Sequence, residues 1–333
     1  MDDDTKGVLL SATTKLKVQP GIAGAAARQS RVVHRGSLLG IEHMPASEIA
    51  SLLALARRMN PAKARPLLRG KKVLLLFYEA STRTRSSFEI AAKSMGAMTT
   101  LVLSSGSSIE KGESLLDTGY TLRAVGADVI VVRHPHAGAP LLMAKNLDIP
   151  VLNAGDGMHE HPTQALLDAY TILQHKKTLK GLQVAIVGDI YHSRVARSAC
   201  YLLSKFGAKV TLCGPPELLP EIASALAPGI QITRTAEDAI RGADVVTALR
   251  VQKERLAGLK ISLQDYIGRY QVTVQRLKLA KRDAILMHPG PIIRGLELTS
   301  EVADSPQSVI VEEVRNGVPV RMAILARALG KAK

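Results

Sequence analysis

Hydroxyl and guanidinium side chains are concentrated in one short segment of the chain, Ser81-Thr82-Arg83-Thr84-Arg85. The segment follows an apolar run at 72–77 and directly precedes a helical pattern at 86–95. The first turn of a helix offers unpaired backbone N–H groups and a partial positive charge, to which this segment adds hydroxyls and arginines. This combination predicts a phosphate cradle, although the glycines of a Walker loop are missing; a capped helix with solvated arginines is the alternative.

Arginine, histidine and glutamine side chains follow further apolar runs along the chain. They are Arg133, His161, Gln164, Arg194, Arg250 and Gln252, together with the turn His288-Pro289-Gly290-Pro291. Ligands of open parallel sheets bind beyond the carboxyl ends of the strands, so we expect these residues to lie near one another. Arginines there suit anions such as carboxylates, and a histidine can donate a hydrogen bond to a carbonyl oxygen. For each residue taken alone, a structural or solvated position is the alternative.

Short apolar runs that alternate with helical patterns must position these loops. The runs predict strands at 72–77, 99–103, 128–132, 183–187, 209–213, 230–233, 244–249 and 284–287, and those at 72–77 and 128–132 are typical of buried strands. Helices are predicted at 45–59, with Ser47 as the N-cap, and at 86–95, 115–125, 161–175, 193–206, 220–226, 235–240 and 320–329. The alternation predicts parallel βαβ units in two α/β halves that divide near the helix at 161–175.

The composition is that of a globular protein with two domains of ordinary size. The chain has 333 residues, of which 46% are hydrophobic and 22% are charged, and this balance excludes wholesale disorder. No apolar run approaches the roughly 18 residues that a membrane-spanning helix needs. The two cysteines, Cys200 and Cys213, exclude a disulfide scaffold and a cysteine-rich zinc site. They fit a reducing compartment, which predicts a cytoplasmic location.

The net charge of +15 is open to two interpretations. A basic chain can bind nucleic acid, or it can be an enzyme for anionic substrates. Aromatic residues make up only 3% of the chain, so platforms for base stacking are not expected. Residues 1–36 contain no acidic residue after Asp4 and predict a mobile or loosely packed extension, with an organellar transit peptide as the alternative.

The order and spacing of these motifs resemble those of the aspartate/ornithine carbamoyltransferase family over about residues 37–330. The Ser-Thr-Arg-Thr-Arg segment at 81–85 and the His-Pro-Thr-Gln segment at 161–164 carry the resemblance. The Arg-Val-Gln-Lys-Glu-Arg segment at 250–255 and the turn at 288–291 look like those of the aspartate-specific members. The ornithine-specific members use a cysteine where this chain has Pro289. The chain departs from the family pattern at Gly290, at 292–295 and before residue 37.

The resemblance implies an α/β fold of two domains, each with a central parallel sheet flanked by helices. Residues 37–162 are expected to form a carbamoyl phosphate-binding domain, completed by a C-terminal helix at about 318–330, and residues 163–317 an aspartate-binding domain. The implied reaction transfers the carbamoyl group of carbamoyl phosphate to the amine of L-aspartate, an early step of pyrimidine (UMP) biosynthesis. The products are N-carbamoyl-L-aspartate and phosphate, and neither a cofactor nor a metal is implied.

The resemblance also implies a role for each residue of the motifs. The residues that hold the phosphate of carbamoyl phosphate are Ser81, Thr82, Arg83 and Thr84. Those that polarise its carbonyl oxygen are Thr84, Arg133 and His161, and these three form the catalytic set together with Arg83. The carbamoyl amino group is oriented by Gln164 and by the backbone carbonyl of Gly290 or Pro291. The aspartate carboxylates are bound by Arg194, Arg250 and Gln252, and domain closure involves Glu79 and Arg255.

A polar, glycine-containing segment at 104–113 is implied to complete the site of a neighbouring subunit. Its matching residues are Ser107 and Lys111, with Ser108 in place of Ser107 if the register shifts by one. Both residues are expected at the carbamoyl phosphate, and Lys111 at the aspartate as well. Shared sites imply a homotrimer. A regulatory chain or a dihydroorotase is a further partner on family grounds, whereas neither nucleic acid nor a membrane is expected.

Three other interpretations stay open. A transferase for a different amine, such as ornithine, needs a site for a cationic side chain, which Arg194 and Arg250 disfavour. A basic nucleic-acid-binding module predicts binding that weakens steeply with salt and no turnover. An inactive structural homologue is disfavoured because every matched site residue is present.

Overall fold

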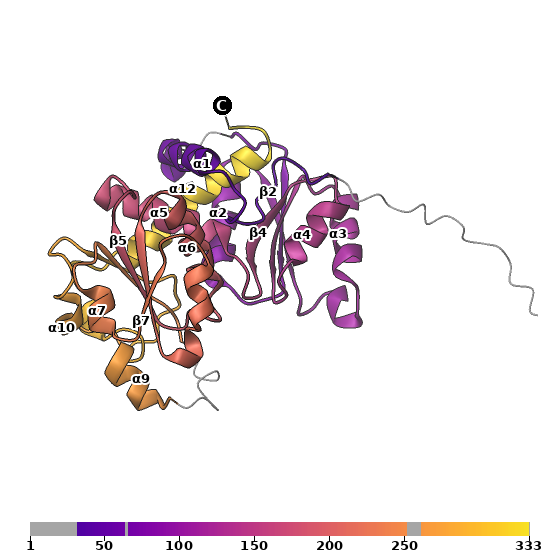
Figure 1. The fold of residues 1–333 in the computed structure, drawn as a ribbon. Coiled ribbons are helices and arrows are strands. Elements are labelled where there is room, and N and C mark those ends of the chain that lie inside the picture. The colour runs from indigo at the N-terminus through magenta and orange to yellow at the C-terminus, as the bar shows by residue number, and fades with distance from the viewer. Residues whose placement is uncertain (1–31, 64–65, 252–260, 333) are drawn as a thin grey trace, which may run out of the picture.

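The computed structural model describes residues 32–63, 66–251 and 261–332. These residues form two parallel sheets, each flanked by helices (Figure 1). The α/β fold of two domains inferred from the sequence is therefore confirmed. The predictions for residues 1–31, Gln252 and Arg255 fall outside the described residues.

The first sheet has the strand order β2-β1-β3-β4. Its strands are β1 (Lys72–Phe77), β2 (Met98–Leu103), β3 (Val129–His134) and β4 (Val151–Asp156), and its helices are α2 (Thr82–Ser94), α3 (Leu115–Ala124) and α4 (Ala139–Asn146). Successive side chains of β1 point to opposite faces. Leu75 therefore packs with Phe88 of α2, while Leu74 packs in a second cluster with Leu122 of α3 and Met143 of α4. Strand β1 is therefore buried on both faces, as its continuous apolar run predicted, whereas the edge strand β2 is only partly covered.

The second sheet has the strand order β7-β6-β5-β8-β9. Its strands are β5 (Gln183–Val187), β6 (Lys209–Cys213), β7 (Gln231–Thr233), β8 (Val245–Ala248) and β9 (Ile285–Met287). The helices around it are α6 (Arg194–Lys205), α7 (Ala236–Ile240), α9 (Leu263–Tyr270), α10 (Val274–Leu277) and α11 (Ser300–Ala303). All paired strands run parallel, so the carboxyl ends of each sheet gather at one edge.

Two long helices connect the domains. Helix α5 (Pro162–Lys176) packs against α6 and against α1 (Ala46–Arg58), and α12 (Ile310–Ala328) packs against α1, α2 and α5. Residues 162–172 of α5 are all buried. One continuous apolar core consequently contains both Leu75 of the first sheet and Ile186 of the second. This shared core couples the two sheets.

Most predicted elements are present, but several helix boundaries differ. The N-cap of α1 is Pro45, so the prediction of Ser47 as the cap is wrong; Ser47 lies in the first turn, and its carbonyl accepts a hydrogen bond from Ser51 Oγ. Helix α2 begins at Thr82 rather than at 86, because the hydroxyl- and arginine-rich segment itself forms the first turn. The segment predicted as a helix at 220–226 is a 3-10 helix, Glu221–Ala225.

The C-terminal helix is longer than predicted, and one helix and one strand of the first domain were not predicted. Helix α12 begins at Ile310, ten residues before the predicted start at 320. The prediction started too late because Gly317 and Pro319 disfavour a helix in the sequence. Both residues are buried against neighbouring elements, where packing outweighs helix propensity.

The sequence analysis also missed α4 and β4, since β4 carries buried polar residues, Asn153 and Asp156. Within the described ranges, no helix is long and apolar enough to span a membrane.

Candidate active site

A cavity of about 600 Å³ opens between the carboxyl ends of the two sheets. Its walls come from Arg133 near the carboxyl end of β3 and from the segments that follow β1, β4, β5, β8 and β9. The predicted site residues that line it are Ser81, Thr82, Arg83, Thr84, Arg133, His161, Gln164, Arg194, Arg250, Gly290 and Pro291, together with Glu79. Segments up to 212 residues apart in the chain, from Glu79 to Pro291, thus meet in one cleft. Parallel strands gather the polar loops at the carboxyl edge of each sheet, and the shared core around α5 and α12 brings the two edges together.

The first turn of α2 forms one wall of the cleft. Ser81 is the N-cap residue, and its side chain makes no capping hydrogen bond, so the hydroxyl is available to a ligand. Thr82, Arg83 and Thr84 follow in the first turn and line the same cavity. Free backbone N–H groups, hydroxyls and a guanidinium converge there, which is the arrangement that binds phosphate. Arg85 does not line the cleft.

Arg83 lies against the turn that follows β9. A Cβ atom built on Gly290 would be 2.5 Å from Arg83 Cζ, and Gly290 has a φ of +66°. Glycine is required at this position both for its backbone conformation and for the close approach of the guanidinium. The peptide bond between Gly290 and Pro291 is cis. Burial lowers the pKa of Arg83, and the charge of Arg250 lowers it further, whereas Glu313 opposes the shift.

Glu79 connects arginines of the two domains. Arg194 Nη2 donates a hydrogen bond to Glu79 Oε2 over 2.7 Å, and Arg133 Nε lies 3.3 Å from the same oxygen. Arg194 begins α6 of the second domain, whereas Glu79 follows β1 and Arg133 lies in β3 of the first. Arg194 Nη1 also donates to the backbone carbonyl of Gly157 over 3.1 Å. One carboxylate therefore holds two cationic groups at the domain junction.

The arginines of the cleft repel one another. Burial lowers the pKa of Arg133 to about 10, and the charges of Arg194 and Arg83 contribute to the shift. The guanidinium still carries a full charge at neutral pH. The four arginines that line the cavity outnumber its two carboxylates, Glu79 and Asp189, and the resulting positive field favours a multiply charged anion.

His161 is a buried, uncharged imidazole at the mouth of α5. It is the N-cap residue of α5, with Pro162 in the first turn, and its backbone N–H donates to Ser198 Oγ over 2.9 Å. Burial and the charges of Arg133 and Arg194 hold the pKa of His161 well below its usual value. Its Nδ1 lies 3.4 Å from Thr163 Oγ1, and a hydroxyl that donates to Nδ1 leaves the proton on Nε2. The ring can then donate a hydrogen bond without carrying a charge.

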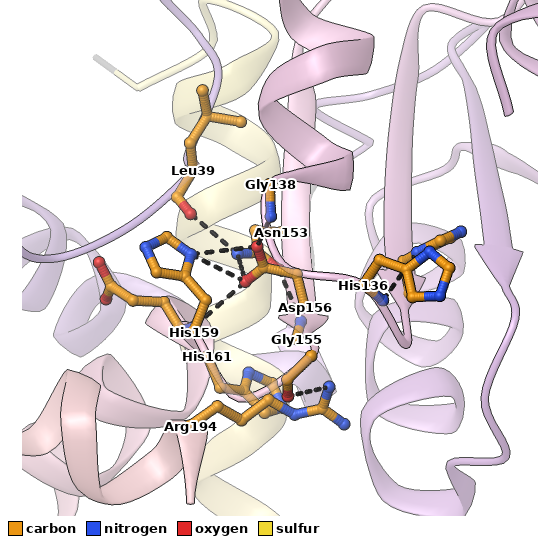
Figure 2. Close-up of polar contacts among 12 residues, drawn as sticks. Leu39, His136, Gly138, Asn153, Gly155, Asp156, His159, His161 and Arg194 are labelled. Atoms are coloured by element: carbon orange, nitrogen blue, oxygen red, sulfur yellow. Dashed lines mark hydrogen bonds and ion pairs between the residues drawn. The ribbon is translucent and has the colours of Figure 1, made fainter. Parts of the chain in front are cut away.

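A buried network supports the loop between β4 and α5. Figure 2 shows Asp156 at its centre, between Asn153, Gly138 and His159. The carboxylate accepts hydrogen bonds from Gly138 N over 2.7 Å and from Asn153 Nδ2 over 2.8 Å. His159 Nδ1 is 3.1 Å from Asp156 Oδ2, and this contact raises the pKa of His159. The network fixes the loop that carries Gly157 and His161, and sequence reasoning did not foresee it.

Two further residues of the cleft were not singled out from the sequence. Asp189 and His192 line the cavity, and His192 Nδ1 lies 3.0 Å from both carboxylate oxygens of Asp189. They follow β5 in the same loop as Arg194, so position after a strand was the signal that could have identified them.

The cleft is not lined by Ser107, Ser108 or Lys111. Ser107 precedes a short 3-10 helix, Ser108–Lys111, which follows β2 and does not line the cleft. The side chain of Lys111 is exposed to solvent. The assignment of Ser107 and Lys111 to a neighbouring subunit's site stays a prediction.

One group outside the cleft has the composition of a metal site. Among the described residues, only Glu42, His159 and Glu160 bring three potential ligand atoms within 4.8 Å of one another. The Glu160 carboxylate already accepts hydrogen bonds from Ile41 N, Glu42 N and Ser198 Oγ. These contacts give Glu160 a structural role, tying the segment before α1 to α6.

Comparisons with known proteins agree over nearly the whole described chain. The family model for the carbamoyl-P binding domain of aspartate/ornithine carbamoyltransferase matches residues 37–174, and the model for the Asp/Orn binding domain matches residues 180–328. The aspartate carbamoyltransferase catalytic subunit of Koribacter versatilis is 64% identical over 295 residues, covering 89% of this chain and 97% of that protein. The corresponding subunit of Solibacter usitatus is 54% identical over 298 residues, covering 88% and 99%.

Solved structures of both branches of the family share the fold. Aspartate transcarbamoylase from Trypanosoma cruzi, in complex with carbamoyl aspartate and phosphate, has a TM-score of 0.78 at 34% identity and covers 87% of this chain and 94% of its own. Ornithine carbamoyltransferase from Pyrococcus furiosus has a TM-score of 0.79 at 29% identity and covers 90% and 99%. From the two family models and these relatives, we conclude that the chain belongs to the aspartate/ornithine carbamoyltransferase family.

Proposed function

We propose that the chain transfers the carbamoyl group of carbamoyl phosphate to the amine of L-aspartate, producing N-carbamoyl-L-aspartate and phosphate. The observation that carries this proposal is the cleft, which opposes the phosphate cradle of α2 with two arginines of the second domain, Arg194 and Arg250. The sites can bind a phosphoryl group and a dicarboxylate side by side. The aspartate carbamoyltransferase catalytic subunits among the relatives support the same activity.

The cradle is the proposed site of the carbamoyl phosphate. Ser81, Thr82, Arg83 and Thr84 bind its phosphate through hydroxyls, backbone N–H groups and the guanidinium. Arg133, His161 and Thr84 donate hydrogen bonds to its carbonyl oxygen. As the amine attacks, that oxygen becomes an oxyanion, and donors already in place stabilise it without reorganising. Each such donor contributes about 10²- to 10³-fold to the rate in comparable enzymes.

The remaining contacts orient the two substrates. Gln164 and the backbone carbonyl of Gly290 or Pro291 accept hydrogen bonds from the carbamoyl amino group. Arg194 and Arg250, with Gln252, bind the carboxylates of aspartate. Glu79, with Arg255, couples substrate binding to closure of the domains, in line with its ion pair to Arg194.

Proton transfer needs no dedicated base in this scheme. The tetrahedral intermediate collapses by breaking the bond between the carbonyl carbon and the phosphate oxygen. The departing phosphate takes the proton from the attacking amine, so the product leaves as a neutral ureido group beside a phosphate ion. His161, uncharged and fully buried, is suited to hydrogen bonding rather than to proton uptake.

We further propose that the active unit is a homotrimer in the cytoplasm. Ser107 and Lys111 lie on a solvent-exposed segment away from their own cleft, which is the placement expected of residues that serve a neighbouring subunit. Lys111 then contacts both substrates of that subunit. The reaction supplies an early intermediate of pyrimidine biosynthesis, and a regulatory chain or a dihydroorotase is a candidate for higher assembly.

The test is formation of ureido product by the purified protein from carbamoyl phosphate, with L-aspartate and L-ornithine in parallel. Product is expected with aspartate alone, because Arg194 and Arg250 repel the cationic side chain of ornithine. Arg83→Ala should lower kcat/KM by about 100-fold or more, since it removes a charge from the phosphate site. Arg123→Ala, whose arginine pairs with Asp148 on the surface, is the matched control and should stay active. Product with ornithine alone would contradict the proposed acceptor.

A further inference from the structure

A buried polar cluster lies directly behind the cleft. Asp168 of α5 and Glu313 and Arg321 of α12 are 9%, 2% and 2% exposed, and none of them lines the cleft. A second, much smaller cavity of about 20 Å³ is lined by Glu313 and Arg321 and also by Arg83 and Gln164. The cluster therefore touches cleft residues from behind, and the reaction scheme above makes no use of it.

Each carboxyl group of the cluster holds a different wall of the cleft. Asp168 Oδ1 accepts a hydrogen bond from Gln164 Nε2 over 2.9 Å. Glu313 Oε2 accepts one from the backbone N–H of His288 over 2.9 Å. His288 Nδ1 in turn accepts from the backbone N–H of Gly290 over 2.8 Å, which extends this support into the turn.

Burial sets the charges of the cluster. It raises the pKa of Asp168 to about 7, against hydrogen bonds and the charge of Arg321. It also raises the pKa of Glu313, with the nearby Asp168 carboxylate as the second cause. Arg321 stays charged, although burial lowers its pKa to about 10, and Arg83 and His288 are the other titratable groups that face the pair. Both shifts favour the protonated form of a carboxyl group, so the pair carries less negative charge beside the cationic Arg321 than two exposed carboxylates would.

We propose that Asp168 and Glu313 are positioning residues that make the cleft selective for the carbamoyl amino group. This inference rests on the function proposed above. Asp168 Oδ1 accepts from the NH₂ end of the Gln164 amide, which leaves Gln164 Oε1 to face the cleft. Glu313 holds the His288–Pro291 turn, whose residues Pro289, Gly290 and Pro291 line the same cavity.

The cleft then offers two hydrogen-bond acceptors to the two N–H donors of the carbamoyl amino group. A carbamoyl NH₂ group satisfies both Gln164 Oε1 and a carbonyl of the turn. Acetyl phosphate carries a methyl group there and leaves both acceptors without a partner, which a buried site penalises strongly. Inorganic phosphate reaches only the cradle at 81–84 and does not report on these acceptors.

Asp168→Asn tests the orientation of Gln164. The new amide can donate as well as accept, so Gln164 is free to turn its NH₂ end into the cleft, where it opposes the carbamoyl donors. At pH 8 we expect the KM for carbamoyl phosphate to rise about 10-fold, while the inhibition constants of acetyl phosphate and inorganic phosphate change less than about 2-fold. In a Gln164→Ala background, Asp168→Asn should add little, because Asp168 acts through Gln164.

Glu313→Gln tests the positioning role of Glu313 with a substitution of nearly the same size. The amide is a neutral isostere that still accepts from His288 N, so the KM for carbamoyl phosphate should stay within about 2-fold of wild type, whereas Glu313→Ala should raise it. Glu312→Gln, on the neighbouring surface position of α12, is the matched control. The activity of this variant should stay at the wild-type level.

The outcomes separate this inference from the proposed function. If the wild-type protein makes no carbamoyl aspartate, the proposed function itself fails. If it does, but Asp168→Asn weakens all three phosphate ligands equally or none of them, the positioning role is wrong. Equal losses in Glu313→Gln and Glu313→Ala would likewise overturn it.

Discussion

The same residue type has different chemistry at positions in and near the cleft. His159 and His161 are two residues apart, yet the pKa of His159 is raised by its hydrogen bond to Asp156, and the pKa of His161 is lowered by burial and nearby arginines. His288 is a third case, since burial and the charge of Arg83 lower its pKa to about 3. The sequence analysis identified His161 and the turn that begins at His288, but not His159. Only their surroundings decide which of them is charged.

The low pKa of His288 predicts a loss of stability in acid. The unfolded chain takes up a proton near pH 6.5 that the folded protein accepts only near pH 3, so the free energy of unfolding falls as the pH drops below 6.5. At pH 5 this amounts to about 2 kcal/mol for His288. His288→Asn, whose amide oxygen can still accept from Gly290 N, should reduce the stability change between pH 7 and pH 5 by about that amount. Urea unfolding at the two pH values measures it.

A suitable control carries the same substitution on the surface. His43→Asn replaces an exposed ring and should leave the pH dependence at the wild-type value. Asp168, with its raised pKa, acts with the opposite sign, but it is present in both variants and cancels in the comparison. Equal pH dependence in His288→Asn and the wild type would show that His288 is not kept neutral by the fold.

Short connections between elements determine the shape of the cleft. The first turn of α2 supplies the hydroxyls and Arg83, and the turn after β9 packs against that arginine through Gly290. Apolar runs identified most strands from the sequence, including β1, β5 and β6 with their observed bounds. The sequence missed β4 because its buried Asn153 and Asp156 look like loop residues until their partners are known.

Gly290 and Gly295 offer a matched pair of substitutions in this region. Both have a positive φ, +66° and +82°, so alanine costs each about 1–2 kcal/mol of backbone strain. Only at Gly290 does the new Cβ meet another group, the Arg83 guanidinium. Gly290→Ala should therefore raise the KM for carbamoyl phosphate by about 10-fold, whereas Gly295→Ala should lower only the thermal midpoint. Comparable KM values in the two variants would argue against the contact with Arg83.

The cleft exists because two domains are held face to face. Helices α5 and α12 run through one core that includes both sheets, and the ion pair of Glu79 with Arg194 closes the junction at the cleft. Neither domain alone contains both the phosphate cradle and the two arginines proposed to bind aspartate. The proposed trimer extends this principle, since Lys111 is expected to complete the cleft of a neighbour.

A shared site predicts that two inactive proteins restore activity together. Lys111→Ala and Arg83→Ala each damage the site, but a hybrid trimer can combine an intact Arg83 on one subunit with an intact Lys111 on the next. After equal amounts are dissociated and reassembled, about a quarter of the sites should be intact, because each of the two positions has an even chance. The assay is carbamoyl aspartate formation before and after reassembly. No recovery, despite mixed trimers, would place Lys111 outside the neighbour's site.

The sequence by itself determined the fold class, the segments that line the cleft and the family. Apolar runs form the strands of parallel sheets, and polar loops after parallel strands gather at the carboxyl edge of each sheet, so local patterns were sufficient. Only the tertiary structure decided that Gln164 is oriented from behind by Asp168, that Glu79 pairs with Arg194, and that His161 is uncharged. These properties depend on burial and on partners distant in the chain. Neither is encoded in local spacing.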